Sequence, residues 1–155
     1  MPSDAGMYSN LVLSLCGDSG QDEESLYRVH CDWAERYEYP HVATGIGFTV
    51  WDPGRTLRIG SLSPDFANHS VAYFVEGVLA NHDHRRFHVT CYADGLTNDD
   101  MTARLRSTAD NWHPTAGLID TALLAQICDD RIDVLIDLAG HTANNRQPLF
   151  ARRAA

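Results

Sequence analysis

From Thr56 onward, short apolar runs alternate with segments that have a helical apolar period, and this alternation constrains the fold more than any other feature of the chain. The runs predict strands at 57–62, 87–92, around Trp112 and at 132–138, and the periodic segments predict helices at 70–79, 99–109, 120–128 and, in a shorter form, 144–152. Asn68 or Ser70 can cap the first of these helices. Strand–helix alternation with short loops predicts an α/β, Rossmann-like parallel sheet with helices on both faces. The apolar run 134–136 fits a central strand of that sheet.

The first 55 residues have a different character, with nine acidic residues against three arginines and no strand pattern. Residues 22–37 predict a helix, because acidic side chains fill its first turn, where they suit the positive end of the helix dipole. Leu26, Trp33 and either Val29 or His30 would form its buried stripe. We therefore expect residues 1–55 to be a connector with one helix and residues 56–155 to be the Rossmann-like domain.

Charge and residue usage exclude several classes of function. The formal net charge is -9, which argues against electrostatic binding to nucleic acid or to a membrane surface. The 12 basic residues are all arginine, so Schiff-base or P-loop lysine chemistry within this chain is excluded. The four cysteines form no CxxC pair, and the sequence contains neither a secretion signal pattern nor an apolar run that could span a bilayer. We expect a cytoplasmic protein.

Two short motifs are weak evidence for a cofactor or metal site when their neighbouring residues are considered. Gly45-Ile46-Gly47 lacks the third glycine and the following helix of a dinucleotide-binding fingerprint, which speaks against a small nucleotide-dependent oxidoreductase. His82-Asp83-His84 has the composition of a metal hairpin, but it lies at a helix end beside two arginines, where cationic side chains are favoured by the helix dipole. The sequence therefore predicts no metal site.

The loops that follow the first and last predicted strands each contain a histidine. In parallel sheets, ligands bind at the carboxyl ends of the strands, where helix N-termini point. His69 at the start of a helix would favour the neutral imidazole, which can act as a general base, or it caps the helix. His141 follows Gly140, which would let backbone approach a ligand, and Thr142 adds a hydroxyl; the alternative is a capped turn. Asp65 would orient a histidine or cap its own loop.

Two blocks of the sequence resemble the O-linked N-acetylglucosamine transferase family, in particular its SPINDLY-like branch. The first block runs from Leu57 to Phe74 and contains Ser63-Pro64-Asp65-Phe66-Ala67-Asn68-His69. The second runs from Asp133 to Thr142, contains Gly140-His141-Thr142, and is followed by Asn145-Arg146. The resemblance covers roughly Thr56 to Arg152 and extends weakly upstream, although Tyr8 stands where the family often has a histidine.

The resemblance implies the first half of a GT-B fold, in which two Rossmann-like domains face each other across a cleft. It implies transfer of a sugar, by expectation N-acetylglucosamine from UDP-GlcNAc, to serine or threonine of an acceptor protein, with inversion and without a metal or a cofactor. His69 would be the catalytic residue, and Asp65, Gly140, His141 and Thr142 would bind substrate. The sugar, the acceptor and the oligomeric state are left open by the resemblance.

The family's second catalytic domain and its upstream tetratricopeptide repeats have no counterpart in these 155 residues. The expected partners are therefore the nucleotide sugar, the acceptor protein and the second catalytic half, and we expect the isolated chain to be inactive. The alternative is a non-catalytic Rossmann-like binding module that docks a partner through an exposed apolar surface.

Overall fold

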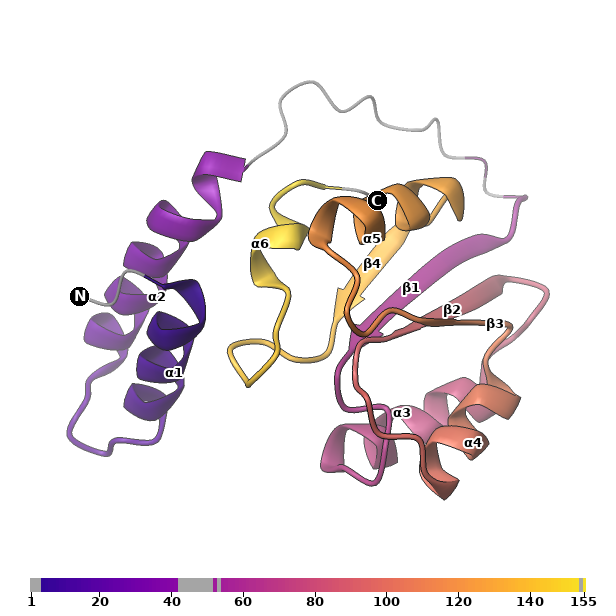
Figure 1. Cartoon of the computed structure of the whole chain (residues 1–155), viewed down its shortest axis with the longest axis horizontal. Helices are drawn as coiled ribbons and strands as arrows, with labels where there is room; N and C mark the ends of the chain where they lie inside the picture. The colour runs from indigo at the N-terminus through magenta and orange to yellow at the C-terminus, as the bar shows by residue number, and fades with distance from the viewer. Residues whose placement is uncertain (1–3, 42–51, 53, 154) are drawn as a thin grey trace. The chain divides into compact units, whose positions relative to one another are not determined.

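The computed structural model describes residues 4–41, 52, 54–153 and 155, and these residues form two compact units (Figure 1). Unit 1 consists of the described residues among the first 46 together with Ala139–Arg153, and unit 2 consists of those from position 47 to Leu138 with the final residue. The glycine pair Gly45-Ile46-Gly47 lies outside the described residues. Each unit has its own set of buried residues.

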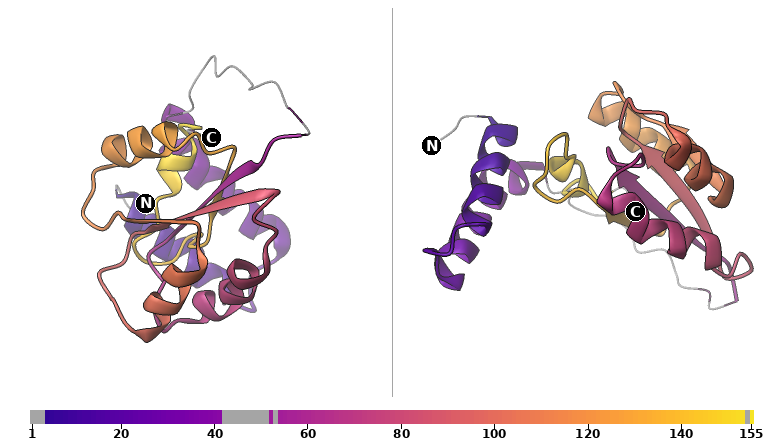
Figure 2. Two further views of the ribbon diagram at one scale, coloured as in Figure 1. Left: turned by 90° about the vertical axis from the view of Figure 1, so that its right-hand side faces the viewer. Right: turned by 90° about the horizontal axis from the view of Figure 1, so that it is seen from below.

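Unit 2 is built on a parallel sheet whose strands alternate with helices along the chain. Its elements are β1 (Leu57–Ser63), α3 (Ser70–Asn81), β2 (Phe87–Ala93), α4 (Asp100–Thr108), β3 (Asn111–Pro114), α5 (Asp120–Asp129) and β4 (Val134–Asp137). The strand order is β3-β2-β1-β4, and the three pairings are all parallel. Figure 2 shows the neighbouring strands β1 and β2 from two further sides. The predicted Rossmann-like α/β architecture is confirmed.

The order of the strands places helices on both faces of this sheet. The chain moves outward from β1 through α3 to β2 and through α4 to β3, and then returns through α5 to β4 on the other side of β1. Because such crossovers are right-handed, α3 and α4 cover one face and α5 covers the opposite face. Leu79 of α3, Cys91 of β2 and Leu105 of α4 are buried together on the first face. Leu123 and Ile127 of α5 are also fully buried.

The sequence placed the run 134–136 in a central strand, and this prediction is wrong for the described sheet. β4 pairs with β1 at the end of the strand order, and Val134 and Ile136 are 45% and 39% exposed. A continuous apolar run shows only that both faces of a strand are hydrophobic. It carries no information on whether another strand lies beyond it.

Unit 1 contains two helices where the sequence predicted one, so that expectation is corrected. They are α1 (Ala5–Cys16) and α2 (Glu23–Tyr37), followed by the 3₁₀ turn η1 (Tyr39–His41), and the unit is completed by α6 (Gln147–Phe150). Asp4 caps α1 by accepting a hydrogen bond from the Met7 N–H at 3.0 Å. Tyr8 and Val12 of α1 are buried against Trp33 of α2. The apolar pattern of α1 is diffuse, because other large residues such as Met7, 62% exposed, face outward.

The N-cap of α3 is His69 and not Asn68 or Ser70, which confirms the capping role that was one of the two alternatives for His69. The apolar residues of α3 are only partly inward, since Phe74 is 82% exposed while Leu79 is buried. Among the described residues, no helix combines the length and the apolarity that crossing a membrane requires.

Candidate functional site

The candidate site of unit 2 lies at the carboxyl edge of its parallel sheet. The Asp94 N–H donates to the carbonyl of Ser63 at 2.9 Å, and the Leu138 N–H donates to the carbonyl of Leu62 at 3.1 Å. The ladder therefore continues to the last residues of the strands, and the chain leaves β1, β2 and β4 at one edge. Ligands of open parallel sheets bind at this edge.

His69 lies at this edge as the N-cap of α3. Its Nδ1 atom accepts a hydrogen bond from the Val71 N–H at 3.3 Å, and the backbone at His69 is extended, as a capping residue requires. The Asp65 carboxylate is the nearest charged partner, with 3.8 Å between Oδ2 and Nδ1. The His69 side chain is 47% exposed, which leaves the rest of the ring accessible to a ligand.

The cap decides which proton the His69 ring presents. A backbone N–H is a donor, so the Nδ1 atom that receives it carries a lone pair, and the neutral ring then has its proton on Nε2. In this state His69 is a hydrogen-bond donor toward a ligand. The ring presents a general base at Nε2 only in the other tautomer, whose Nδ1–H would turn toward Asp65.

The loop that carries His69 is held by the start of α4. Asp99 caps that helix and also accepts a hydrogen bond from the Asn68 N–H at 2.8 Å. Thr102 donates its hydroxyl to the carbonyl of Phe66 at 2.8 Å. The backbone N–H groups of Thr102 and Asn68 hold the pKa of Asp99 below its usual value, so the carboxylate stays ionised. Asp99 and Thr102 were not among the site residues predicted from the sequence, although the Asp-x-x-Thr spacing of a capping box was present.

Gly95 supports the same loop by its lack of a side chain. A Cβ atom at Gly95 would lie 2.1 Å from the carbonyl oxygen of Pro64, a distance at which the backbone has to move. The segment after β2 therefore lies in close contact with the loop after β1. This contact fixes the approach of the loop to the sheet edge.

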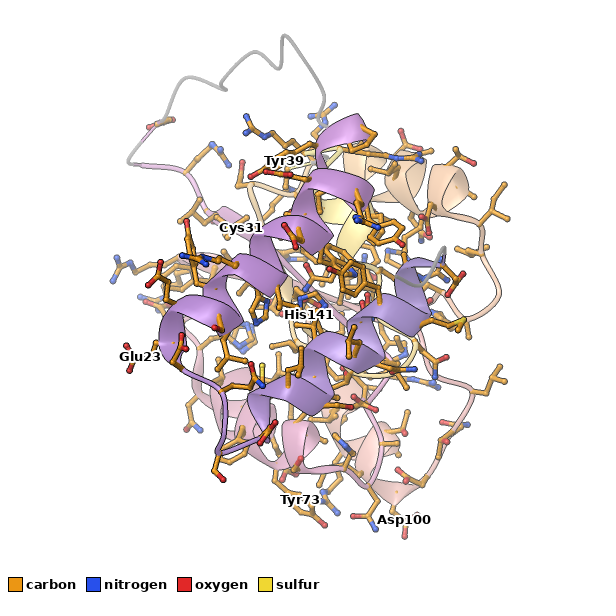
Figure 3. All side chains as sticks on the ribbon, turned by 90° about the vertical axis from the view of Figure 1, so that its left-hand side faces the viewer. Glu23, Cys31, Tyr39, Tyr73, Asp100 and His141 are labelled. Atoms are coloured by element: carbon orange, nitrogen blue, oxygen red, sulfur yellow. The ribbon has the colours of Figure 1, made fainter. Side chains whose placement is uncertain are left out.

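His141 belongs to unit 1, where it contacts side chains of both long helices (Figure 3). Its Nδ1 atom lies 3.1 Å from the hydroxyl of Ser9 on α1. Its ring meets Trp33 edge-on at 4.8 Å between centroids and lies 5.1 Å from the ring of His30. The ring is half-buried. The contacts give His141 a packing role in addition to any contact with substrate.

Gly140 and Thr142 form a tight turn around His141. Gly140 has φ of +57°, a left-handed conformation that favours glycine, and a Cβ there would meet nothing within 4 Å. The Thr142 hydroxyl donates to the carbonyl of Ala139 at 2.7 Å. The sequence predicted that the Thr142 hydroxyl would donate to a ligand, but its proton is donated within the turn. The hydroxyl oxygen of Thr142 can therefore only accept a hydrogen bond from a ligand.

Unit 2 also contains an apolar groove, of about 580 Å³, on the face of the sheet beside α3. Its lining is mostly aliphatic and aromatic, and comprises Ile59, Ser61, Val75, Val78, Leu79, Asn81, His82, Asp83, Phe87, Val89, Ile136 and Leu138. A nucleotide sugar needs hydrogen-bond donors for its phosphates. The mostly apolar groove therefore does not suit a nucleotide sugar, in contrast to the loop that carries His69.

Comparison with known proteins gives consistent matches over nearly the whole chain. Residues 31–155 match the family model for glycosyl transferase family 41. A tomato protein described as a probable UDP-N-acetylglucosamine–peptide N-acetylglucosaminyltransferase SPINDLY is 32% identical over 99% of this chain and 17% of its own length. The Arabidopsis thaliana protein of the same description is 34% identical over 86% of this chain and 15% of its own length.

A solved structure agrees with these sequence matches. The K341M mutant of the Thermobaculum terrenum O-GlcNAc transferase superposes with a TM-score of 0.95 at 34% identity, over 99% of this chain and 30% of that chain. The present chain thus spans less than a fifth of the length of these two curated relatives.

The parallel sheet and these matches together define a glycosyltransferase fold. The chain belongs to glycosyl transferase family 41, as its family-model match and its identity to SPINDLY proteins show. The resemblance seen in the sequence blocks around His69 and His141 is confirmed.

Proposed function

We propose that this chain forms the N-terminal part of a catalytic region that transfers N-acetylglucosamine from UDP-N-acetylglucosamine to serine or threonine of a protein, with inversion. The names of the SPINDLY relatives support the donor and a peptide acceptor. The observation that carries the proposal is His69, capping α3 at the carboxyl edge of a family 41 sheet with its ring half exposed.

His69 is the proposed catalytic residue, and its protonation state suggests how it acts. Sugar transfer needs a hydroxyl that loses its proton and a leaving diphosphate whose charge is stabilised. With Nδ1 used by the Val71 N–H, the Nε2–H of His69 is suited to donate to the diphosphate or to the sugar. The N-terminus of α3, a helix of 12 residues, adds its dipole in the same place. A base role would require the tautomer that pairs with Asp65.

The proposed substrate-binding residues are Asp65, Gly140, His141 and Thr142, and their contacts support a specific role for each. Asp65 would orient the ring of His69, since its carboxylate lies 3.8 Å from Nδ1. Gly140 leaves open space where a Cβ would stand, so a ligand can approach the backbone there. Thr142 would accept a hydrogen bond, because its proton is given to Ala139. His141 would contact substrate while Ser9 orients it.

We propose a cytoplasmic location, because none of the four cysteines forms a disulfide and Cys91 is buried as a thiol. Free thiols are typical of a reducing compartment.

A chimera tests the proposed function. The matching segment of the Thermobaculum terrenum enzyme, which is 34% identical, is replaced by this chain, and transfer of radiolabelled N-acetylglucosamine to a peptide is measured. We expect the chimera to transfer sugar and the isolated chain, which spans 30% of that enzyme, to transfer none. A folded chimera without transfer, or turnover by the isolated chain, would contradict the proposal.

The second candidate is a non-catalytic interaction module, and the apolar groove beside α3 favours it. Val78 is 65% exposed at the groove, so an apolar helix of a partner chain is its natural occupant. This alternative predicts that the chimera is folded and inactive. It also predicts that a Val78→Asp variant of the chain loses its partner. Transfer of sugar by the chimera would contradict the interaction-module alternative.

A further inference from the structure

Two histidines and an aspartate come together at the amino ends of β2 and β3, the edge opposite to the loop that carries His69. His82 and His84 lie in the turn after α3, and Asp110 lies directly before β3. His82 Nε2 is 2.9 Å from one carboxylate oxygen of Asp110, and His84 Nδ1 is 2.7 Å from the other. The two imidazole rings are 4.0 Å apart. The tertiary fold thus adds a third potential ligand to the His-x-His pair.

The hydrogen bonds of His82 leave the lone pair of its Nε2 atom facing another acceptor. Its Nδ1 atom lies 2.8 Å from the carbonyl oxygen of Leu79, which can only accept, so Nδ1 carries a proton. In the neutral ring Nε2 then has a lone pair, and this lone pair points at the Asp110 carboxylate, which is also an acceptor. The contact needs a cation between the two atoms, either a second proton or a metal ion.

We propose that His82, His84 and Asp110 form a binding site for a divalent metal ion of the zinc type. Imidazole nitrogens and a carboxylate oxygen are ligands that zinc accepts, and three protein ligands with a water complete a tetrahedral shell. A histidine that ligates zinc characteristically donates its other N–H to a carbonyl or carboxylate, as His82 does to Leu79. The proposal is independent of the proposed sugar transfer.

The distances in the cluster are compatible with such an ion after a small outward movement. Ligand atoms at about 2.0–2.1 Å from a tetrahedral ion lie about 3.4 Å apart. The ligand atoms offered by the three residues all lie within 4.8 Å of one another, and the two contacts to Asp110 are 2.7 and 2.9 Å. Separation of the carboxylate from the rings by about half an ångström admits the ion. The exposed side chain of His84, at 61%, can move away from Asp110 and leaves an entry path, and a small rotation of the Asp110 carboxylate opens its contact with the largely buried side chain of His82.

The charge of the cluster favours a cation. Although burial raises the pKa of Asp110, the hydrogen bond from the Val89 N–H, at 2.7 Å, lowers it and favours the ionised carboxylate. Of the two neighbouring arginines, Arg86 directs its guanidinium over the ring of Phe87, at 5.4 Å from the ring centre. A bound ion would tie the turn after α3 to the turn before β3.

Titration of the purified chain with Zn²⁺ alone tests the site. We expect one ion per chain, a raised unfolding temperature, and an affinity that falls more than about tenfold in His84→Ala. His84 is exposed, so this variant keeps the fold, and Asp110→Asn, which retains the shape of the side chain, is the second variant. His88→Ala, a histidine within β2 that is outside the cluster, is the matched control and should bind as the unchanged chain does.

Replacement of Zn²⁺ by Co²⁺ identifies the ligands. Coordination by imidazole and carboxylate gives visible ligand-field bands without the near-ultraviolet charge-transfer band of a thiolate, which separates this cluster from the four cysteines. The proposal is overturned if no stoichiometric binding occurs, if a thiolate band appears, or if His84→Ala and Asp110→Asn bind as the unchanged chain does.

Discussion

The Nδ1 atom of His69 accepts the backbone N–H of Val71 at 3.3 Å, so one imidazole both begins α3 and faces the carboxyl edge of the sheet. The same side chain thus caps a helix and has the proposed role in sugar transfer. The cap fixes the proton on Nε2 in the neutral ring, and it places that proton beside the positive end of the α3 dipole.

Replacement of His69 separates the two roles, because asparagine is a strong helix cap and alanine is a weak one. We expect His69→Asn to keep the free energy of unfolding and His69→Ala to lower it by about 0.5–1 kcal/mol. Urea denaturation of the chain measures both. Equal stability of the two variants would show that the cap does not contribute to folding.

Two glycines of unit 2 should respond to alanine in opposite ways. A Cβ at Gly95 would stand 2.1 Å from the Pro64 carbonyl oxygen, so Gly95→Ala should displace the loop and cost about 1–3 kcal/mol. Gly77 lies within α3 with nothing within 4 Å of its Cβ position, so Gly77→Ala should stabilise by about 0.5–1 kcal/mol. Thermal unfolding followed by circular dichroism gives both signs. A stabilising Gly95→Ala variant would contradict the close contact.

The Arg55–Asp133 pair predicts a loss of stability in acid. Arg55 donates to both carboxylate oxygens of Asp133 at 2.6 Å, and the Arg58 N–H adds a third bond at 2.8 Å. The Arg55 hydrogen bonds are the main reason that the pKa of Asp133 is lowered from 3.8. Because the folded pKa is the lower one, the stabilisation is complete above the unfolded value and is lost as the pH falls through the folded value.

Asp133→Asn should therefore cost about 1–3 kcal/mol at neutral pH and much less once the pH is below the folded pKa. Denaturation midpoints of the variant and the unchanged chain, measured at pH 7 and in the acid range, give the comparison. A difference between the two proteins that does not shrink in acid would show that Asp133 acts through packing alone.

The Tyr8 hydroxyl is buried without a hydrogen-bond partner among the described residues. Its ring makes an edge contact with Tyr37 at 6.1 Å, which phenylalanine would keep. We expect Tyr8→Phe to leave the free energy of unfolding unchanged or to raise it by about 1 kcal/mol. Trp33→Phe is the control, because it removes the indole donor to the Ala5 carbonyl at 3.2 Å and should destabilise. Destabilisation by Tyr8→Phe would reveal a partner for the hydroxyl.

The positions of most strands and helices of unit 2 could be predicted from the sequence, because the apolar period reports burial along one element. Leu57–Ser63, Phe87–Ala93 and Asp120–Asp129 lie close to their predicted bounds. The edge position of β4 could not, since strand order depends on crossovers between distant segments. The helix α1 was missed because its apolar residues surround the helix rather than following one stripe.

The places of the candidate residues in the chain could be predicted from the sequence, but their hydrogen-bond partners could not. His69 was placed at a helix start from its neighbours, yet only the structure shows its Nδ1 atom to be the capping acceptor. The Thr142 hydroxyl donates its proton to the Ala139 carbonyl in a turn that has no clear sequence pattern. Asp110 joins His82 from 28 residues away, and a separation of that kind leaves no local pattern.

The central claim is that His69 handles the sugar nucleotide in a family 41 transferase. The most direct test is the turnover of the chimera with the Thermobaculum terrenum enzyme when His69→Ala is compared with His88→Ala, under saturating UDP-N-acetylglucosamine. We predict that His69→Ala lowers turnover by about a hundredfold or more, because a donor to developing charge is lost, and that His88→Ala changes it little. Turnover of the His69→Ala chimera within about twofold of the unchanged chimera, against that expected loss, would contradict the claim.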